Sequence, residues 1–391
     1  MENKFKLSQI FKLVIPTILM MSFMSLYTIV DGAFVSRFVG TDALSAVNIA
    51  YPYVNFVLGI SIMLGTGGCA LVMKKVGEGK NDEAKKDFSL IISFALIFSI
   101  ILCFFSVLFI EQILKLLGTT DSLYQYTKDY LFFAIIFVTP TILKFIVEQF
   151  LVAINKSKTA LFLSVSGGIL NIILDYVFIV LLDFGIKGAA IATGIGYAIP
   201  AIIGLSFFIN KSNLLYFKTP SKSTKVIFDS CFNGCSEMVS QLSNGIITFL
   251  FNMVMLKYIG EDGVASITIV LYIQFLVTSV FLGYSIGISP KISFYYGNQD
   301  TNMLKNIIST SFKLIWAISI IIYFSILLAS PLLVRFFAEP GTNVFDITID
   351  GLKIYSFSFL MVGTNILMSG MFTAFSNGKV SAIISLLKTL V

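Results

Sequence analysis

Acidic side chains inside long apolar runs are the residues of this sequence most able to do chemistry. Asp31 interrupts an apolar stretch that extends from residue 14 to residue 35. A stretch of this length predicts a membrane-spanning helix. A carboxylate in the hydrocarbon zone costs roughly 2.5–3.5 kcal/mol on insertion scales. We therefore expect Asp31 to face a cavity or a partner helix, the alternative being a solvated position at the outer rim of the membrane.

A second acid, Asp175, lies one helical turn after Asn171, so the two side chains are predicted to share a helix face. At about 1.5 Å per residue, Asp31, Asp175 and Thr193 reach nearly the same depth in the outer half of the membrane. Two carboxylates this close raise one another's affinity for a proton. The pattern predicts a site that holds a proton or a small cation. The alternatives are a loop-supporting role for Asp175 and ordinary interhelical hydrogen bonds for Asn171 and Thr193.

Three further charged residues lie inside predicted spans. Lys144 and Glu148 are spaced i, i+4, which predicts either a structural ion pair or, for Glu148, contact with a cationic substrate. Glu237 precedes Gln241 by one turn, and we expect both to line a substrate cavity. A position of Glu237 at the cytoplasmic rim is the alternative.

The elements that must position these residues are membrane helices. Hydrophobic residues form 57% of the 391 residues and charged residues only 12%, against about 25% charged in soluble proteins. We predict an all-α polytopic membrane protein with spans near 13–36, 46–71, 89–110, 130–153, 160–182, 189–210, 228–256, 264–289, 309–332 and 354–375. The net charge of +6 is explained by lysines that flank the spans, so it requires no nucleic-acid partner. With four cysteines and no histidine, we expect no metal cluster.

The two halves of the sequence repeat one another. Residues 38–46 resemble residues 258–266, and the loop 79–82 resembles 297–300, at an offset of about 220 throughout. This predicts two parallel bundles of six helices, a design used by transporters. The bundles are expected at 1–212 and 226–391, joined by a polar cytoplasmic linker at 213–225. By the same count, the second bundle lacks most of its eleventh helix and all of its twelfth.

The distribution of lysine and arginine predicts the orientation in the membrane. With the N-terminus inside, about 17 basic residues fall on the cytoplasmic side and about 7 on the outer side. We therefore predict a multi-pass protein of the cell membrane with a cytoplasmic N-terminus.

The chain resembles the multidrug and toxic compound extrusion (MATE) transporters of the bacterial type along its entire length. The resemblance rests on Pro16, Tyr27 and Asp31 in the first span, the Asn171-x-x-x-Asp175 pair, the segment 188–193, and the repeated halves. It implies twelve helices in two bundles and outward extrusion of amphipathic, often cationic compounds, driven by inward flow of H⁺ or Na⁺.

The resemblance also implies roles for single residues. It carries cation coupling onto Asp31, Asn171, Asp175 and Thr193, and the bend of the first helix onto Pro16. Independently, a proline inside a helix removes a backbone hydrogen bond and can kink it. Tyr27 precedes Asp31 by one turn and could hydrogen-bond into the site.

Other classes of function are weighed against this one. A flippase of a lipid-linked precursor, or an exporter of an endogenous metabolite, belongs to the same superfamily. A flippase would want several cationic residues in its cavity, whereas Lys144 is the one evident candidate deep in a span. An enzyme is disfavoured because no catalytic motif is evident. We expect a monomer in the lipid bilayer that takes a small amphipathic substrate and needs no cofactor beyond the transported H⁺ or Na⁺.

Overall fold

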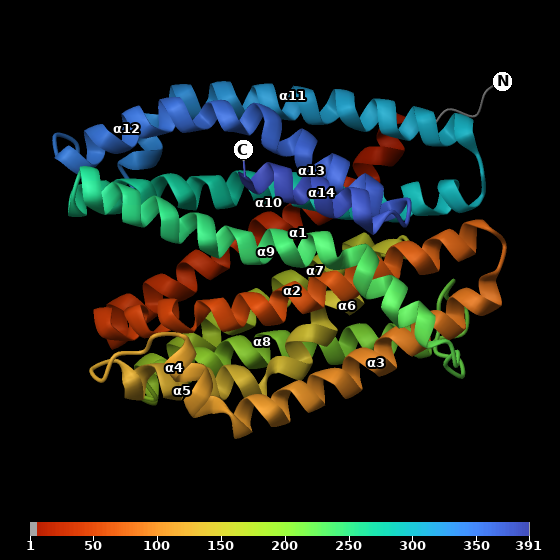
Figure 1. Ribbon diagram of the computed structural model, residues 1–391, viewed down its shortest axis with the longest axis horizontal. Coiled ribbons are helices and arrows are strands. Elements are labelled where there is room, and N and C mark those ends of the chain that lie inside the picture. Colours follow the sequence, from red (N-terminus) through yellow and green to blue (C-terminus); the bar gives the residue numbers. More distant parts are fainter. Residues whose placement is uncertain (1–5, 391) are drawn as a thin grey trace.

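The computed structural model describes residues 6–390, and within that range every regular element is a helix. Residues 1–5, which include Lys4 of the predicted cytoplasmic flank, and residue 391 lie outside the described residues, as do the side chains at 41, 249 and 388–390. The helices fall into two layers in Figure 1, one formed early and one formed late in the chain. We call the layer from α1 to η3 the N-terminal half and the layer from α9 to α14 the C-terminal half.

The N-terminal half contains α1 (Leu7–Phe34), η1 (Val35–Val39), α2 (Thr41–Gly77), α3 (Asn81–Leu108), α4 (Ile110–Leu116), α5 (Tyr124–Ile136), α6 (Val138–Ala153), α7 (Ser157–Asp175), η2 (Tyr176–Leu181), α8 (Ile186–Ser206) and η3 (Phe207–Ile209). The C-terminal half contains α9 (Thr224–Tyr258), α10 (Glu261–Gly297), α11 (Thr301–Val334), α12 (Asn343–Tyr355), η4 (Ser356–Ser358), α13 (Phe359–Ala374) and α14 (Gly378–Leu390).

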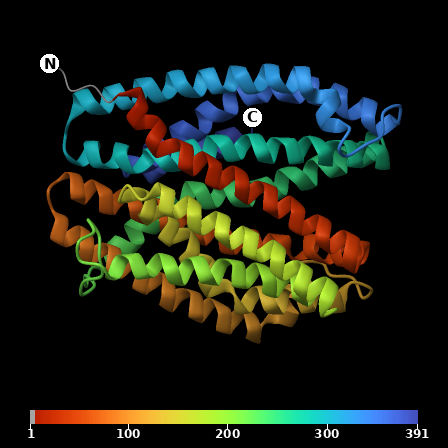
Figure 2. The same ribbon diagram turned by 180° about the vertical axis from the view of Figure 1, so that it is seen from behind.

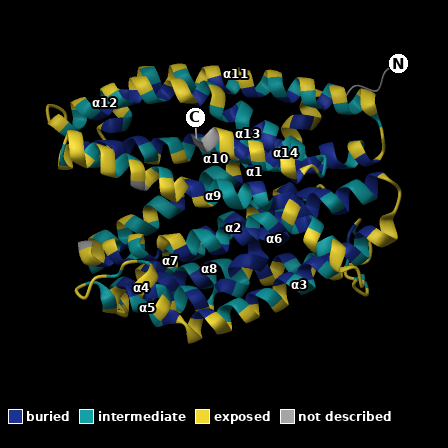
Figure 3. Cartoon of the chain, viewed as in Figure 1, coloured by how far each residue is buried: buried dark blue, intermediate teal, exposed yellow. Residues whose placement is uncertain are grey.

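The predicted membrane spans are confirmed. Within the described residues, 9 helical segments are long and apolar enough to cross a membrane, and the bent pair α5–α6 brings the number to 10. Large apolar side chains such as Phe104, Ile321 and Leu328 are exposed on the outer helices α3 and α11. Figure 3 shows this contrast between exposed outer faces and the buried α2 and α6. The exposed apolar surface is what a lipid environment requires.

The fourth predicted span is bent, which the sequence interpretation did not anticipate. α5 and α6 meet at Phe137 with an angle of 52° between them. Pro140 lies three positions after this break and has no N–H to donate to the carbonyl of Ile136. The lost hydrogen bond explains why the helix breaks here and why Pro140 lies in the first turn of α6.

The two halves have separate hydrophobic cores, and α1 contacts both. One core is built from residues between 20 and 215 and the other from residues between 267 and 374. Ile10 and Val14 at the start of α1 belong to the second core, whereas Met20 belongs to the first. Figure 2 shows α1 running obliquely from the C-terminal half into the N-terminal half. Pro16 lies at the point where α1 passes from one core to the other.

The halves are in close contact at the end predicted to be cytoplasmic. A Cβ atom on Gly77 would lie 2.0 Å from the carbonyl oxygen of Phe294, and one on Gly297 would lie 2.0 Å from that of Lys74. These contacts are reciprocal, because Lys74 corresponds to Phe294 and Gly77 to Gly297 at the repeat offset of about 220. In Figure 1 the halves converge at this end and diverge toward the other.

The segment between the halves is fixed to the N-terminal half. Residues 210–223 contain no helix, and the Lys218 ammonium binds Asp82 at 2.8 Å. The Phe217 ring stacks on Phe88 with 5.4 Å between centroids. Lys218 N–H also donates to the Ser89 hydroxyl at 2.9 Å. The linker therefore follows the N-terminal half as one body.

Candidate functional site: a carboxylate pair inside the N-terminal half

Asp31 and Asp175 both lie where a regular helix changes into a wider π-helical turn. Asp31 is in the last turn of α1, directly before η1, and Asp175 is the last residue of α7, directly before η2. The two wide turns, η1 and η2, contact one another. Wide turns of this kind inside helices are frequent at functional sites. Here they end two helices at one level and bring the two acids together.

The predicted cation-site residues come together in the structure. The Asp31 carboxyl interacts with the side chains of both Asp175 and Asn171. Asn171 Nδ2 donates to Thr193 Oγ1 at 3.2 Å, which connects α7 to α8. Asp175 is 0% exposed and Asn171 is 2% exposed. Three helices thus supply four polar side chains to one buried point.

The site has more hydrogen-bond acceptors than donors. Asp31 Oδ1, Asn171 Oδ1 and both carboxylate oxygens of Asp175 are buried without a hydrogen-bond partner among the described residues. Buried polar atoms are normally paired, and leaving one unpaired costs about 1–3 kcal/mol. A set of orphaned oxygens from carboxylates and an amide suits a proton or a hard cation, which prefers oxygen ligands.

Tyr27 lies beside this site but donates its hydroxyl elsewhere. The Tyr27 hydroxyl donates to the Tyr197 hydroxyl at 3.3 Å, while Tyr27 still interacts electrostatically with Asp31. Tyr197 was not among the residues predicted from the sequence. It follows Thr193 by one turn of α8, so its i, i+4 spacing from a predicted site residue could have revealed it.

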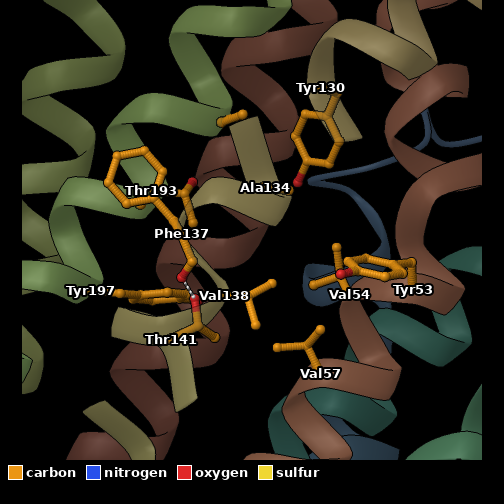
Figure 4. Close-up of a pocket in the computed structure, with 12 residues that line it drawn as sticks. Tyr53, Val54, Val57, Tyr130, Ala134, Phe137, Val138, Thr141, Thr193 and Tyr197 are labelled. Carbon is orange, nitrogen blue, oxygen red and sulfur yellow. Dashed lines mark hydrogen bonds between the residues drawn. The ribbon is translucent and has the colours of Figure 1, made fainter. Parts of the chain in front are cut away.

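A small cavity opens next to the site, as Figure 4 shows. It has a volume of about 50 Å³ and is lined by Thr193 and Tyr197 together with residues of α2, α5 and α6. The hydroxyl groups of Tyr53 and Tyr130 point into it (Figure 4). The volume is enough for a few water molecules and too small for a drug-sized compound. Thr193 lines this cavity, whereas Asp31, Asn171 and Asp175 are not among its lining residues.

Lys144 and Glu148 form the ion pair that their spacing predicted. Lys144 Nζ lies 3.3 Å from Glu148 Oε1, and the two residues are 2% and 4% exposed. Ser164 on α7 and Tyr197 on α8 interact with Glu148. This places Glu148 inside the N-terminal half and favours the ion-pair interpretation over contact with substrate.

Glu237 and Gln241 lie on α9, which packs along α2 of the other half. Both are partly exposed, and Gln241 Oε1 accepts from Asn244 at 3.4 Å. The next position after Glu237, Met238, contacts Gly59 of α2. Glu237 therefore lies close to the surface between the halves, at the level where α2 and α9 begin to separate.

No group of three or more histidine, cysteine, aspartate or glutamate residues that could hold a metal ion occurs in the described part of the chain. The oxygen atoms around Asp31 and Asp175 are suited to a monovalent cation or a proton.

Comparison with known proteins agrees with this architecture. The MatE family model matches residues 16–177 and 238–391. The multidrug export protein MepA of Staphylococcus haemolyticus is 26% identical over 98% of this chain and 85% of its own length. The crystal structure of MATE in complex with MaD3S superposes with a TM-score of 0.91 at 23% identity, over 98% of this chain and 85% of that chain. A MATE family transporter solved in an outward-facing conformation also gives 0.91, at 22% identity over 97% and 85%.

The described residues form two helical halves with 9 to 10 apolar segments able to cross a membrane, and they share the polytopic fold of the solved MATE structures. The chain belongs to the MatE family of bacterial membrane transporters, because the family model matches well over half of its length.

Proposed function

We propose that this protein is an antiporter that exports amphipathic, often cationic drugs in exchange for inward H⁺ or Na⁺. The observation that carries the proposal is the carboxylate pair of Asp31 and Asp175, in which Asp31 Oδ1 and both oxygens of Asp175 are buried without a hydrogen-bond partner among the described residues. Membership of the family and the relatives named as multidrug export proteins support the drug-export part.

Binding of the coupling cation would act on the charge of the pair. Two adjacent ionised carboxylates in a low-dielectric interior repel one another. A proton or Na⁺ between them removes the repulsion, and the Asn171 and Thr193 oxygens can complete the coordination of Na⁺. The helix ends at η1 and η2 can then approach each other, which changes the position of α1.

Pro16 is suited to pass this change to the C-terminal half. It is buried in α1 between Val14, which belongs to one core, and Met20, which belongs to the other. Because proline removes one backbone hydrogen bond, the helix bends most easily here. A shift of the Asp31 end would thus alter how the two halves are packed.

The drug would bind in the space between the halves. The halves are in close contact at Gly77 and Gly297, so we propose that the described state is open to the outside. Glu237 and Gln241 on α9 are placed to meet a cationic substrate from the C-terminal side. One chain supplies both sides of this space, which supports a monomeric transporter.

Export of a lipid-linked or endogenous metabolite is the second candidate. A pyrophosphate headgroup would need unpaired cationic side chains between the halves. Lys144, the deep lysine that the sequence offered, is instead buried inside the N-terminal half against Glu148. This placement favours the drug exporter.

The test is gradient-driven efflux of a fluorescent organic cation from proteoliposomes, with proton and sodium gradients imposed separately. The Asp31→Asn variant mimics a permanently protonated site, so efflux should fall to the level seen without a gradient while membrane insertion is unchanged. Asp82→Asn, which removes an acid at the exposed end of α3, is the matched control and should keep efflux. Full efflux by Asp31→Asn with a verified gradient would falsify the assignment.

A further inference from the structure

A second pair of buried charged residues lies in the same half as the Asp31–Asp175 pair. Lys144 and Glu148 are 2% and 4% exposed, and their charged atoms are 3.3 Å apart. Among the described residues, neither Lys144 Nζ nor Glu148 Oε1 makes a well-aligned hydrogen bond, although Ser164 interacts with Glu148 and Lys144 Nζ lies 4.3 Å from the centroid of the Phe145 ring. Apolar side chains of similar volume would often be at least as stable in such a buried region. A pair retained under these conditions invites a functional explanation.

Two tyrosines lie between this pair and the carboxylates. Lys144 Nζ is 5.1 Å from the centroid of the Tyr197 ring, and the Tyr197 hydroxyl accepts from Tyr27 at 3.3 Å. Each tyrosine interacts electrostatically with Glu148 and also with Asp31. The Tyr27–Tyr197 hydrogen bond thus lies between the ion pair and Asp31, and it connects α8 to α1, where Tyr27 precedes Asp31 by one turn.

α3 packs against α6 and carries the buried acid Asp87, which is paired with Lys75 at 2.6 Å. The other neighbouring helices place uncharged groups near this path. α7 contributes the Ser164 hydroxyl, and α5 and α2 contribute the phenols of Tyr130 and Tyr51, which interact with Tyr197 or Asp31. α10 also packs against α6 and carries the partly buried Lys291, for which no ionic interaction with Glu148 is found among the described residues. Lys144 and Glu148 are therefore the charges that act on the carboxylate site through this path.

We propose that the Lys144–Glu148 pair tunes the cation affinity of the Asp31–Asp175 site through Tyr27 and Tyr197. The inference rests on the proposed function of that site. The pair is a positioning element: its opposite charges nearly cancel at the carboxylates, so the site binds a cation neither too weakly to capture it nor too tightly to release it.

The proposal predicts opposite effects when one or the other charge of the Lys144–Glu148 pair is removed. Glu148→Gln leaves the Lys144 ammonium uncompensated, and its positive charge opposes cation binding at Asp31. Lys144→Met leaves the Glu148 carboxylate uncompensated, and its negative charge favours cation binding. A unit charge at a distance on the order of 10 Å in a medium of effective dielectric about 20 changes an equilibrium by roughly tenfold, which is about one pH unit.

The experiment measures drug efflux by purified, reconstituted variants over a series of external pH values and Na⁺ concentrations. For Glu148→Gln, the pH midpoint of efflux should fall by about one unit, or the Na⁺ concentration for half-maximal efflux should rise about tenfold. For Lys144→Met, both should move the other way. The uncharged double variant, Lys144→Met with Glu148→Gln, should return close to wild type. Shifts in the same direction for both single variants, or no shift in either, would overturn the proposal and leave a structural ion pair.

Removing one member of a buried pair destabilises many proteins, so a charge-swapped variant keeps the test decisive. Lys144→Glu with Glu148→Lys preserves the pair and its net charge. It moves the carboxylate one helical turn toward the end of α6 that shares the level of Asp31. Cation affinity should therefore rise, in the sense of Lys144→Met but by less. An unchanged or lower affinity in the folded swapped variant contradicts the proposal.

The experiment distinguishes failure of the tuning role of Lys144 and Glu148 from failure of the proposed function. If efflux by the wild type responds to neither pH nor Na⁺, the coupling role of Asp31 and Asp175 is wrong, and the tuning role is overturned with it. If the wild type responds and the Asp31→Asn variant does not, the coupling site stands and the shifts of the Lys144 and Glu148 variants alone decide the tuning role.

Discussion

The two halves of the molecule share one plan but bury different chemistry. Among the described residues, the buried polar side chains of the N-terminal half include the charged groups of Asp87, Lys144, Glu148 and Asp175. The buried polar side chains of the C-terminal half are serines, threonines and one asparagine. The two halves therefore share one arrangement of helices, but the N-terminal half buries charged side chains where the C-terminal half, among its described residues, buries neutral ones.

The difference extends to how the buried groups are satisfied. In the C-terminal half, the Ser381 hydroxyl lies within 3.0 Å of the hydroxyls of Ser236, Ser369 and Thr373, so these groups satisfy one another. In the N-terminal half, both oxygens of Asp175 lack a hydrogen-bond partner among the described residues. The C-terminal half also buries hydroxyls without such a partner, for example those of Ser311 and Ser319, but these groups are neutral, whereas a carboxylate responds to an added proton or ion. The comparison assigns the cation response to the N-terminal half and helix packing to the hydroxyl cluster.

The strongest test of this comparison removes the second carboxylate. Asp175→Asn should abolish gradient-driven efflux, as Asp31→Asn does, because either change neutralises the same coupled unit. The double variant should be no worse than either single variant, since contacting residues are not additive. Efflux from proteoliposomes measures the effect. A double variant that loses a further, separate fraction of activity would show that the two acids act independently.

The next test concerns what the halves have in common, the reciprocal contact at the end predicted to be cytoplasmic. Gly77→Ala and Gly297→Ala each place a Cβ 2.0 Å from a carbonyl of the other half. Overpacking of this kind costs about 1–3 kcal/mol, which changes a conformational equilibrium by about 5- to 150-fold. Both variants should shift the protein away from the described state by similar amounts, measured as greater labelling of a cysteine introduced at this end.

Gly245→Ala in α9 is the control for the glycine variants, because a Cβ there meets nothing within 4 Å. It should leave the labelling pattern as in the wild type. An effect of Gly77→Ala without an effect of Gly297→Ala would contradict the reciprocal packing of the halves.

The sequence predicted the spans, and it predicted which polar side chains meet, because both follow from local rules; cation binding by these side chains stays a prediction. Long apolar runs determine the spans, and equal depth along the membrane normal brings Asp31, Asp175 and Thr193 together. The bend at Phe137 was missed because Pro140 lies in what reads as one continuous apolar run. The Tyr27–Tyr197 contact was missed because it depends on how α1 and α8 are rotated about their own axes. That rotation is set by packing against neighbouring helices, and residue spacing within one helix does not specify it.

A smaller effect is expected at the surface between the halves. If Glu237 contacts the substrate, Glu237→Gln should weaken binding of cationic compounds by roughly tenfold, the loss expected for a charged hydrogen bond. Binding of neutral compounds should change little. Tryptophan fluorescence or calorimetric titration with a matched pair of charged and neutral drugs measures both. Equal losses for the two compounds would indicate a folding effect and remove Glu237 from the substrate site.

The smallest predicted effect compares one hydroxyl from each half. Thr193→Ala removes the acceptor for Asn171 Nδ2 and should weaken coupling-cation affinity about fivefold, as for one hydrogen bond. Thr373→Ala removes a hydroxyl that contacts Ser381 and should lower thermal stability while leaving cation affinity as in the wild type. Cation-dependent efflux and melting curves separate the two. A loss of cation affinity in Thr373→Ala would place part of the coupling in the C-terminal half.

Direct binding of the coupling ion to purified protein tests the central claim most closely. Uptake of radioactive Na⁺ and release of protons into weakly buffered medium would be measured for the wild type and for the Asp31→Asn, Asp175→Asn double variant. The account predicts that the wild type binds Na⁺, or takes up a proton when the pH falls, and that the double variant loses this binding while still folding and inserting. Undiminished cation binding by the folded double variant would contradict the account.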